Sequence, residues 1–119
     1  MLILDDERGM RAALHQAELS AEHDEVPVGC VIVHDGFVIG RGRNQTEGLQ
    51  DSTAHAEILA IGAASNALGS WRLNECTMYV TLEPCAMCAG AIILARVHRL
   101  VYGADDPKAG ACGSVLDVI

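Results

Sequence analysis

The chain has 119 residues, a mass of 12.6 kDa, 50% hydrophobic residues and a formal net charge of −8 at pH 7. A chain of this length can bury roughly two thirds of its unfolded surface, so we expect residues 1–119 to form a single domain. No apolar run reaches the ~20 residues of a membrane span and no basic start precedes an apolar stretch, so neither a membrane span nor a signal peptide is indicated and a soluble cytoplasmic protein is the default expectation.

The first expected element is an amphipathic helix. Small and apolar side chains recur one helical turn apart near the beginning of the chain, at Met10, Ala13, Leu14, Ala17 and Ala21. This rhythm is typical of a helix laid on a core. It predicts a helix over roughly residues 6–23, with Asp5 or Asp6 as its N-cap.

Two β-rich runs follow, Val28–Val33 and Phe37–Gly40, on either side of Asp35-Gly36. An Asp-Gly pair between two such runs is a strong signal for a hairpin turn, so we expect an antiparallel pair of strands. Glycines and polar residues then predict a loop over residues 41–52.

The second half of the chain has a strand–helix–strand pattern. A helix is expected from about Thr53 to about Leu68, and Cys76–Leu82 has the composition of a buried strand. Pro84 is suited to open the next helix, and Leu100–Gly103 is the strand after it. This order predicts a right-handed parallel crossover, with ligands bound at the carboxyl ends of the strands.

His55, Cys85 and Cys88 predict a catalytic zinc site. Imidazole and thiolate groups are zinc ligands, and a catalytic zinc keeps three protein ligands and one exchangeable water. Cys85 and Cys88 stand three residues apart, so in the first turn of a helix both sulfurs leave the same face. Glu57, in an apolar stretch beside His55, is the candidate general acid and base. We therefore expect one Zn²⁺ per chain and hydrolytic chemistry.

The spacing also predicts how the site is built. His55 and Glu57 stand two residues apart, which would point them roughly 200° away from each other on the side of a helix. Both side chains can reach one metal site only if that site lies beyond the N-terminal end of the helix. Two helix N-termini aimed at one metal would also favour the thiolate forms of the cysteines.

A closed structural zinc site in a non-catalytic domain is the competing interpretation. It needs a fourth ligand, such as Cys76 or Cys112, and it has no use for an acid two residues from the histidine. Cys30 and Cys76 lie in apolar, strand-like runs, where small core residues are the simpler expectation.

Stretches well beyond the metal ligands resemble the bacterial tRNA-specific adenosine deaminases. They are Val26–Gly29, Thr53–Ile58, Thr81–Ile93 and Tyr102–Lys108. The H-x-E and P-C-x-x-C signature alone is shared with deaminases of cytidine, cytosine, guanine and deoxycytidylate, so it indicates the chemistry and not the substrate. The run Met87–Ala91 and the segment Gly103–Lys108 favour the tRNA-editing branch.

The resemblance implies a cytidine-deaminase-like α/β fold, a three-layer αβα arrangement around a mixed sheet. Relatives continue past the position of Ile119, so we expect the chain to lack the family's last strand and C-terminal helix. The implied activity is zinc-dependent hydrolytic deamination of adenosine to inosine in RNA, most simply at the wobble position of a tRNA anticodon. The implied partners are the anticodon stem-loop and a second copy of the chain in a homodimer.

The resemblance also implies roles for substrate-binding residues. Asn44 and the backbone of Ala56 would hold the target nucleoside, and Asp106 and Lys108 map onto a loop that touches neighbouring nucleotides. Glu57 would take a proton from water and pass it to the purine ring. Without the resemblance, Asn44, Asp106 and Lys108 would indicate only turns.

The net charge keeps a second function open. Phosphate contacts normally come from Lys and Arg, so a charge of −8 counts against an RNA substrate. The acidity is concentrated in residues 1–25, which hold seven acids and two bases. A deaminase of a free base or nucleoside, such as guanine, cytosine or cytidine, is the alternative that the charge favours.

Overall fold

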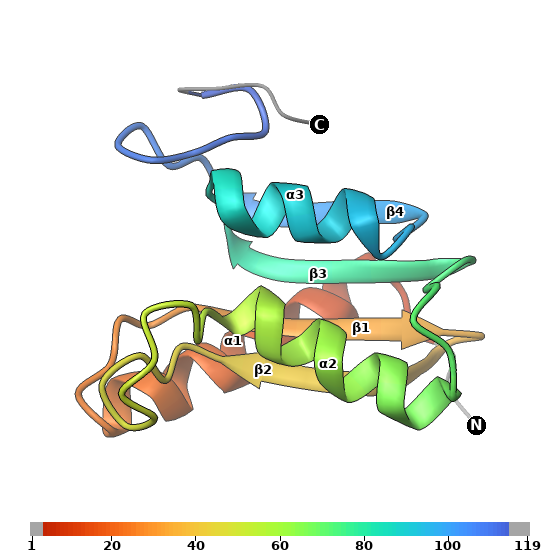
Figure 1. Ribbon diagram of the computed structural model, residues 1–119, viewed down its shortest axis with the longest axis horizontal. Coiled ribbons are helices and arrows are strands. Elements are labelled where there is room, and N and C mark those ends of the chain that lie inside the picture. Colours follow the sequence, from red (N-terminus) through yellow and green to blue (C-terminus); the bar gives the residue numbers. More distant parts are fainter. Residues whose placement is uncertain (1–3, 115–119) are drawn as a thin grey trace.

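The structure is a computed structural model that describes residues 4–114 (Figure 1). The elements in this range are α1 Asp6–Glu22, β1 Gly29–His34, β2 Phe37–Arg43, α2 Ala56–Leu68, β3 Cys76–Leu82, α3 Ala86–Leu94 and β4 Arg99–Ala104. The described strands lie in the order β2-β1-β3-β4. β1 is antiparallel to β2 and β3, and β3 is parallel to β4. The expected mixed sheet, hairpin and parallel crossover are therefore confirmed.

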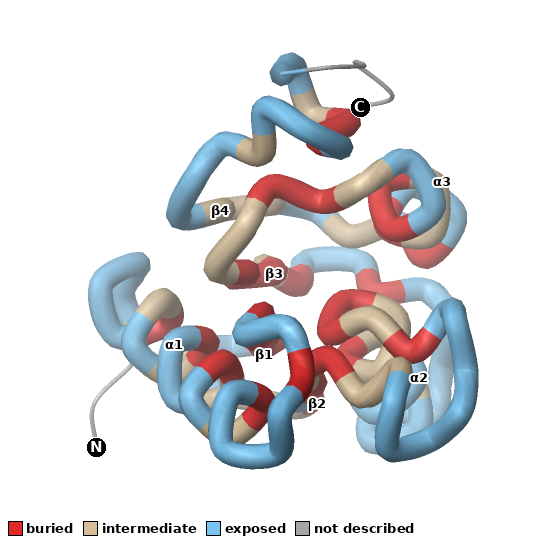
Figure 2. The backbone as a smooth tube through the Cα atoms, turned by 90° about the vertical axis from the view of Figure 1, so that its left-hand side faces the viewer, coloured by how far each residue is buried: buried red, intermediate tan, exposed pale blue. Residues whose placement is uncertain are grey.

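Helices cover both faces of this sheet. Successive side chains of a strand point to opposite faces. Val31 of β1 accordingly packs in a cluster with Ala13 of α1, whereas Ile32 packs in a cluster with Ala60 of α2 and Ile92 of α3. In Figure 2 the buried backbone of β1 lies between α1 and α2. This is the expected three-layer αβα fold, and none of the described helices is long and apolar enough to cross a membrane.

The N-terminal helix is held at its first turn by two acids. The Asp5 side chain accepts a hydrogen bond from the Arg8 N–H at 2.9 Å, as an N-cap should. Asp6 accepts hydrogen bonds from both guanidinium nitrogens of Arg99, at 2.7 and 2.6 Å, and from the Tyr79 hydroxyl at 2.7 Å. These bonds, led by Arg99, lower the pKa of Asp6 and tie α1 to β3 and β4.

Strand β2 extends beyond the predicted Phe37–Gly40 and ends at Arg43. The prediction of a loop at residues 41–43 was wrong. Gly40 and Gly42 do not mark a loop but allow α2 to pack closely on the strand. A Cβ atom on Gly40 would lie 2.6 Å from the Ala60 carbonyl oxygen, and one on Gly42 would lie 2.1 Å from that of Ala56. Glycine thus lets the backbone of α2 lie directly on β2.

Candidate metal and substrate site

Helices α2 and α3 begin on the side of the molecule where β3 ends (Figure 1). His55 is the N-cap of α2 and Cys85 is the N-cap of α3, both with extended backbone. Pro84 was expected to open α3. It lies just before the N-cap instead, and so outside the helix. Neither N-cap side chain makes a capping hydrogen bond. Both side chains are free to bind a ligand at the helix ends, where the helix dipoles favour negative charge.

The three predicted ligands meet. His55 Nδ1 lies 3.6 Å from Cys85 Sγ and 3.6 Å from Cys88 Sγ, and the three ligand atoms are all within 4.8 Å of one another. Zinc–nitrogen and zinc–sulfur bonds of about 2.0 and 2.3 Å in a tetrahedron would separate nitrogen from sulfur by about 3.5 Å. The group can therefore hold one metal ion.

No fourth ligand joins this group among residues 4–114. Cys76 begins β3, whereas the site lies beyond its far end, and its Sγ atom lies 3.7 Å from Nδ1 of His34. Cys30 and Cys76 are buried, as expected for core residues. In the part of the chain that the structure describes, the arrangement matches the open catalytic geometry and not the closed structural one.

Glu57 is buried beside the metal group, with 4% of its surface exposed. Burial raises the pKa of its carboxyl group, and the nearby His55 acts in the opposite direction. Burial, followed by the Glu57 carboxylate, likewise raises the pKa of the Cys88 thiol. A cation bound between these groups would offset the desolvation of both charges.

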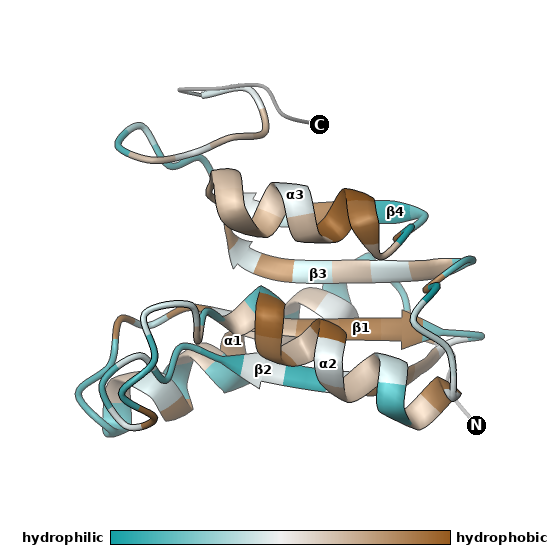
Figure 3. Cartoon of the chain, in the orientation of Figure 1, coloured by the Kyte–Doolittle hydropathy of each residue, from teal (hydrophilic) through white to brown (hydrophobic). Residues whose placement is uncertain are grey.

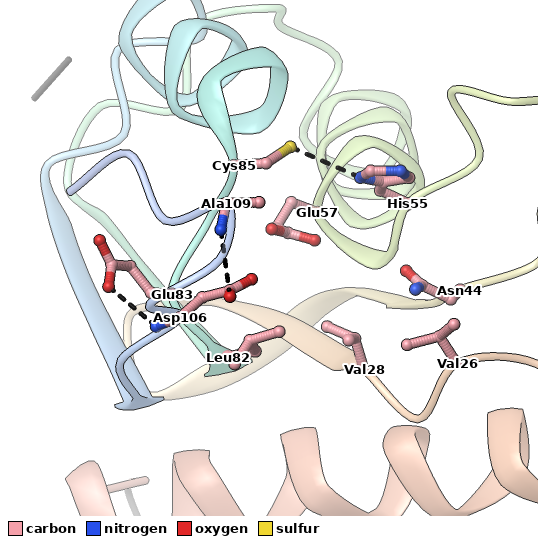
Figure 4. Close-up of a pocket in the computed structure, with 10 residues that line it drawn as sticks. All are labelled: Val26, Val28, Asn44, His55, Glu57, Leu82, Glu83, Cys85, Asp106 and Ala109. Atoms are coloured by element: carbon pink, nitrogen blue, oxygen red, sulfur yellow. Dashed lines mark hydrogen bonds between the residues drawn. The ribbon is translucent and has the colours of Figure 1, made fainter. Parts of the chain in front are cut away.

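A cavity of about 240 Å³ opens onto the group, and Figure 4 shows Glu57 directed into it together with His55, Cys85 and Asn44. Its apolar lining comes from Val26, Val28, Leu82 and Ala109. Its other polar residues are Glu83 and Asp106. This volume is below the ~300 Å³ at which sites that enclose a whole small ligand begin, so it suits a single base whose attached groups stay outside.

Asn44 is fixed by three hydrogen bonds. Its side-chain Oδ1 accepts from the Ala56 N–H at 2.8 Å, its N–H donates to Val28 O at 3.2 Å, and its carbonyl accepts from the Ser20 hydroxyl at 3.1 Å. The Nδ2 group is then the part of the amide left for a ligand in the cavity that Asn44 lines. The Ala56 N–H is used within the protein and holds Asn44.

Asp106 and Lys108 lie on the segment that follows β4. Asp106 lines the cavity, and its Oδ1 accepts hydrogen bonds from the N–H groups of Lys108 and Ala109 at 3.0 and 3.2 Å. Lys108 is exposed and is absent from the cavity lining. The structure thus brings Asp106 to the site and leaves the Lys108 cation at its edge.

Sequence reasoning missed Glu83, which is only 2% exposed. It accepts hydrogen bonds from the N–H groups of Asp106, Cys112 and Ser114 at 3.0, 2.9 and 3.1 Å, and from the Ser114 hydroxyl. These bonds, led by the Ser114 hydroxyl, lower the pKa of Glu83 to about 2. One sign of its role was available in the sequence. Glu83 is a charged residue between the predicted buried strand Cys76–Leu82 and Pro84, a position where a side chain is expected to be buried.

The sequence is similar to known deaminases over almost its whole length. Residues 4–119 match the profile of the MafB19-like deaminases. The tRNA-specific adenosine deaminase of Bacillus subtilis (strain 168) is 49% identical over 114 residues, which cover 96% of this chain and 71% of the relative. The chain belongs to the tRNA-specific adenosine deaminase family. The predicted resemblance is confirmed.

Two further family comparisons agree. The chloroplastic tRNA(adenine(34)) deaminase of Arabidopsis thaliana is 59% identical over 109 residues, which span 92% of this chain and only 8% of that much longer protein. The tRNA-specific adenosine deaminase of Agrobacterium fabrum is 56% identical over 105 residues, with 88% of this chain and 69% of the relative covered.

Solved structures share the fold. One, from a study of A-to-I editing by tRNA:A34 deaminases at the wobble position of transfer RNA, has a TM-score of 0.88 and 55% identity, covering 91% of this chain and 83% of that chain. The guanine deaminase of Bacillus subtilis has a TM-score of 0.85 and 37% identity, covering 93% of this chain and 71% of that chain.

Proposed function

We propose that this chain is a zinc-dependent hydrolase that converts adenosine to inosine in RNA, at the wobble position of a tRNA anticodon. The observation that carries the proposal is the convergence of His55, Cys85 and Cys88 with the buried Glu57 on one cavity. Family membership supports the choice of substrate, because the relatives at 49–59% identity are named for tRNA or its adenine 34.

Zinc suits the three donors best. Two sulfurs and one imidazole nitrogen are soft or borderline ligands, which favours zinc over magnesium or calcium. When bound, Zn²⁺ supplies a Lewis acid that lowers the pKa of a water molecule toward neutrality. His55, Cys85 and Cys88 would hold one such ion per chain.

Glu57 is the proposed proton carrier. Its carboxylate lies in the cavity beside the metal group, where it can take a proton from the attacking water. It delivers that proton to the purine ring nitrogen as the C6–O bond forms. A second proton, taken from the same oxygen, goes to the departing amino group as the C6–N bond breaks. Adenosine and water thus become inosine and ammonia.

The substrate contacts follow from the cavity. Asn44 presents its Nδ2 donor to the nucleoside, and the Ala56 N–H fixes the direction of that donor. Asp106 and Lys108 contact nucleotides beside the target from the edge of the cavity. A base in an anticodon loop can leave the stack and enter a pocket of about 240 Å³ while the RNA backbone stays outside.

A purine-base deaminase is the second candidate. The fold matches a guanine deaminase at a TM-score of 0.85, and the net charge of −8 does not attract phosphates. The identity of 37% to that enzyme is below the 49–59% found for the tRNA enzymes, which supports RNA as the first choice.

The exposed apolar side chains of helix α3 support the proposal that the chain forms a homodimer. It is apolar around most of its circumference, as Figure 3 shows at its brown C-terminal end. Met87, Ile93 and Leu94 are 38, 43 and 70% exposed. A second copy covering this face would remove these side chains from water. Leu94→Glu should then shift the protein from dimer to monomer in analytical ultracentrifugation.

The test of the function uses a stem-loop RNA with adenosine in its loop, beside free adenosine, cytidine and guanine. At low ionic strength, where phosphate attraction is strongest, the RNA should yield inosine and the free compounds should not react. Glu57→Gln should keep zinc and fold but lose at least about a hundredfold in kcat. Rapid reaction of a free compound with no change in the RNA would transfer the assignment to the second candidate.

A further inference from the structure

Glu83 follows β3 directly, and its carboxylate faces the segment formed by residues 106–114. All of its protein hydrogen-bond donors described above belong to this segment. They include the N–H groups of Asp106, at the beginning of the segment, and of Ser114, at its end. One buried side chain therefore holds both ends of an irregular segment that follows β4.

The segment fits closely around this carboxylate. A Cβ atom on Gly110 would lie 2.5 Å from Cδ of Glu83 and 2.6 Å from the Asp106 carbonyl oxygen. The Gly110 N–H donates to the Asp106 carbonyl at 2.9 Å, and the Ala111 N–H donates to the Pro84 carbonyl at 2.9 Å. The chain thus turns tightly over Glu83 and Pro84, with no room for a side chain at Gly110.

The same segment forms part of the wall of the substrate cavity. Asp106 and Ala109 line the cavity, as does Glu83 itself (Figure 4). We propose that Glu83 is a positioning residue, which holds residues 106–114 in place as one wall of the cavity and thereby sets the affinity for the substrate. It acts on the substrate through this wall and not by proton transfer.

A carboxylate is suited to this task because it only accepts hydrogen bonds. Three backbone N–H groups and one hydroxyl point at it, and a buried negative charge needs several such donors. In Glu83→Gln one oxygen becomes an NH₂ group that faces these donors, so part of the network is lost while the side-chain volume stays the same. Loosening of the segment is the expected consequence.

The kinetic part of the test rests on the proposed function and uses the stem-loop RNA as substrate. Glu83→Gln should keep about one zinc per chain, raise KM about tenfold or more and leave kcat within about threefold. Hydrogen–deuterium exchange should become faster in residues 106–114 and stay unchanged in α2. Asp6→Asn is the matched control, because Asp6 also accepts several hydrogen bonds but holds the start of α1 to Arg99, at the other end of β4. It should leave KM unchanged.

Two more variants separate this role from simple misfolding. Ser114→Ala removes one hydrogen-bond donor to Glu83 and should also raise KM. Ser114→Thr keeps the hydroxyl and should have the KM of the wild type. Gly110→Ala places a Cβ atom 2.5 Å from Cδ of Glu83, so it must push the segment and the carboxylate apart, and it should raise KM as well. Unchanged exchange in residues 106–114 of Glu83→Gln would overturn the proposal. A Glu83→Gln variant that loses zinc and has a lower kcat at an unchanged KM would overturn the proposal as well. Exchange and zinc content need no substrate, so they test Glu83 even if the RNA is not deaminated.

Discussion

The side-chain carbonyl of Asn44 accepts a hydrogen bond from the N–H of Ala56 at 2.8 Å, which joins the end of β2 to the first turn of α2. Because the oxygen is used in this bond, the amide nitrogen is what Asn44 offers to the cavity. One residue therefore binds the first N–H of the helix that carries Glu57 and, in the proposed function, provides a donor to the substrate.

Asn44→Asp separates these two tasks. The carboxylate can still accept from Ala56, and its charge suits a helix N-terminus, so the fold should persist. The donor is lost, and KM for the stem-loop RNA should rise about tenfold or more. Asn44→Ala should in addition lower the melting temperature, because it removes the acceptor for the Ala56 N–H. Equal KM values for wild type and Asn44→Asp would exclude the proposed donor role.

Metal removal should destabilise the protein as well as inactivate it. The three ligands come from the N-termini of two helices, so a bound ion links α2 to α3. Cys88→Ala should lose zinc and lower the melting temperature, and a chelator should have the same effect on the wild type. Cys76→Ala is the control, and it should keep about one zinc per chain by elemental analysis. Loss of zinc from the Cys76 variant would revive the four-ligand interpretation.

The Asp6 carboxylate should make stability depend on pH in the acid range. Its pKa is lowered in the folded protein by Arg99, so the folded state binds this proton less readily than the unfolded state does. The contribution is therefore present above the ordinary value of 3.8 and is lost as the pH falls below it. Urea unfolding of Asp6→Asn should show a deficit at pH 7 that shrinks toward pH 3. Arg99→Met should behave alike, and a deficit independent of pH would contradict this account.

Two glycines near α2 should respond to alanine in opposite ways. In Gly42→Ala the new Cβ atom would lie 2.1 Å from the Ala56 carbonyl, so the helix must move away from β2. We expect a loss of about 1–3 kcal/mol in the free energy of unfolding, as for other overpacked sites. Gly62 lies within α2, and a Cβ atom on it would meet nothing within 4 Å apart from the adjacent backbone of its own helix. Gly62→Ala should stabilise by about 0.5–1 kcal/mol, and chemical denaturation measures both.

Most of the metal site could be predicted from the sequence because its residues have distinctive chemistry and form two short spacings, His55 with Glu57 and Cys85 with Cys88. The order of helices and strands followed from periodicity and from glycine and proline positions. Strand β3 was predicted with its observed bounds, Cys76–Leu82.

The parts that could not be predicted depend on contacts between distant residues. In the sequence, Gly40 and Gly42 indicate a loop. Their actual role, to let α2 lie close to β2, depends on a contact that only the fold shows. Glu83 stands beside a buried strand in the sequence, but nothing near it indicates its donors, which lie 23–31 residues further along the chain. Ser20 likewise gives no local sign that its hydroxyl reaches Asn44, 24 residues away. Tertiary hydrogen bonds of this kind leave no periodic pattern.

Hydrolysis at C6 of an adenosine in RNA transfers the oxygen atom of water to the product, so isotope incorporation reveals the reaction. The stem-loop RNA is incubated with the zinc-loaded protein in oxygen-18 water, digested to nucleosides and measured by mass spectrometry. We expect inosine that carries one oxygen-18 atom, one ammonia released per inosine, and at least about a hundredfold slower formation of labelled inosine with Glu57→Gln. An RNA that remains free of labelled inosine, while free guanine or adenosine acquires the label, would contradict this expectation.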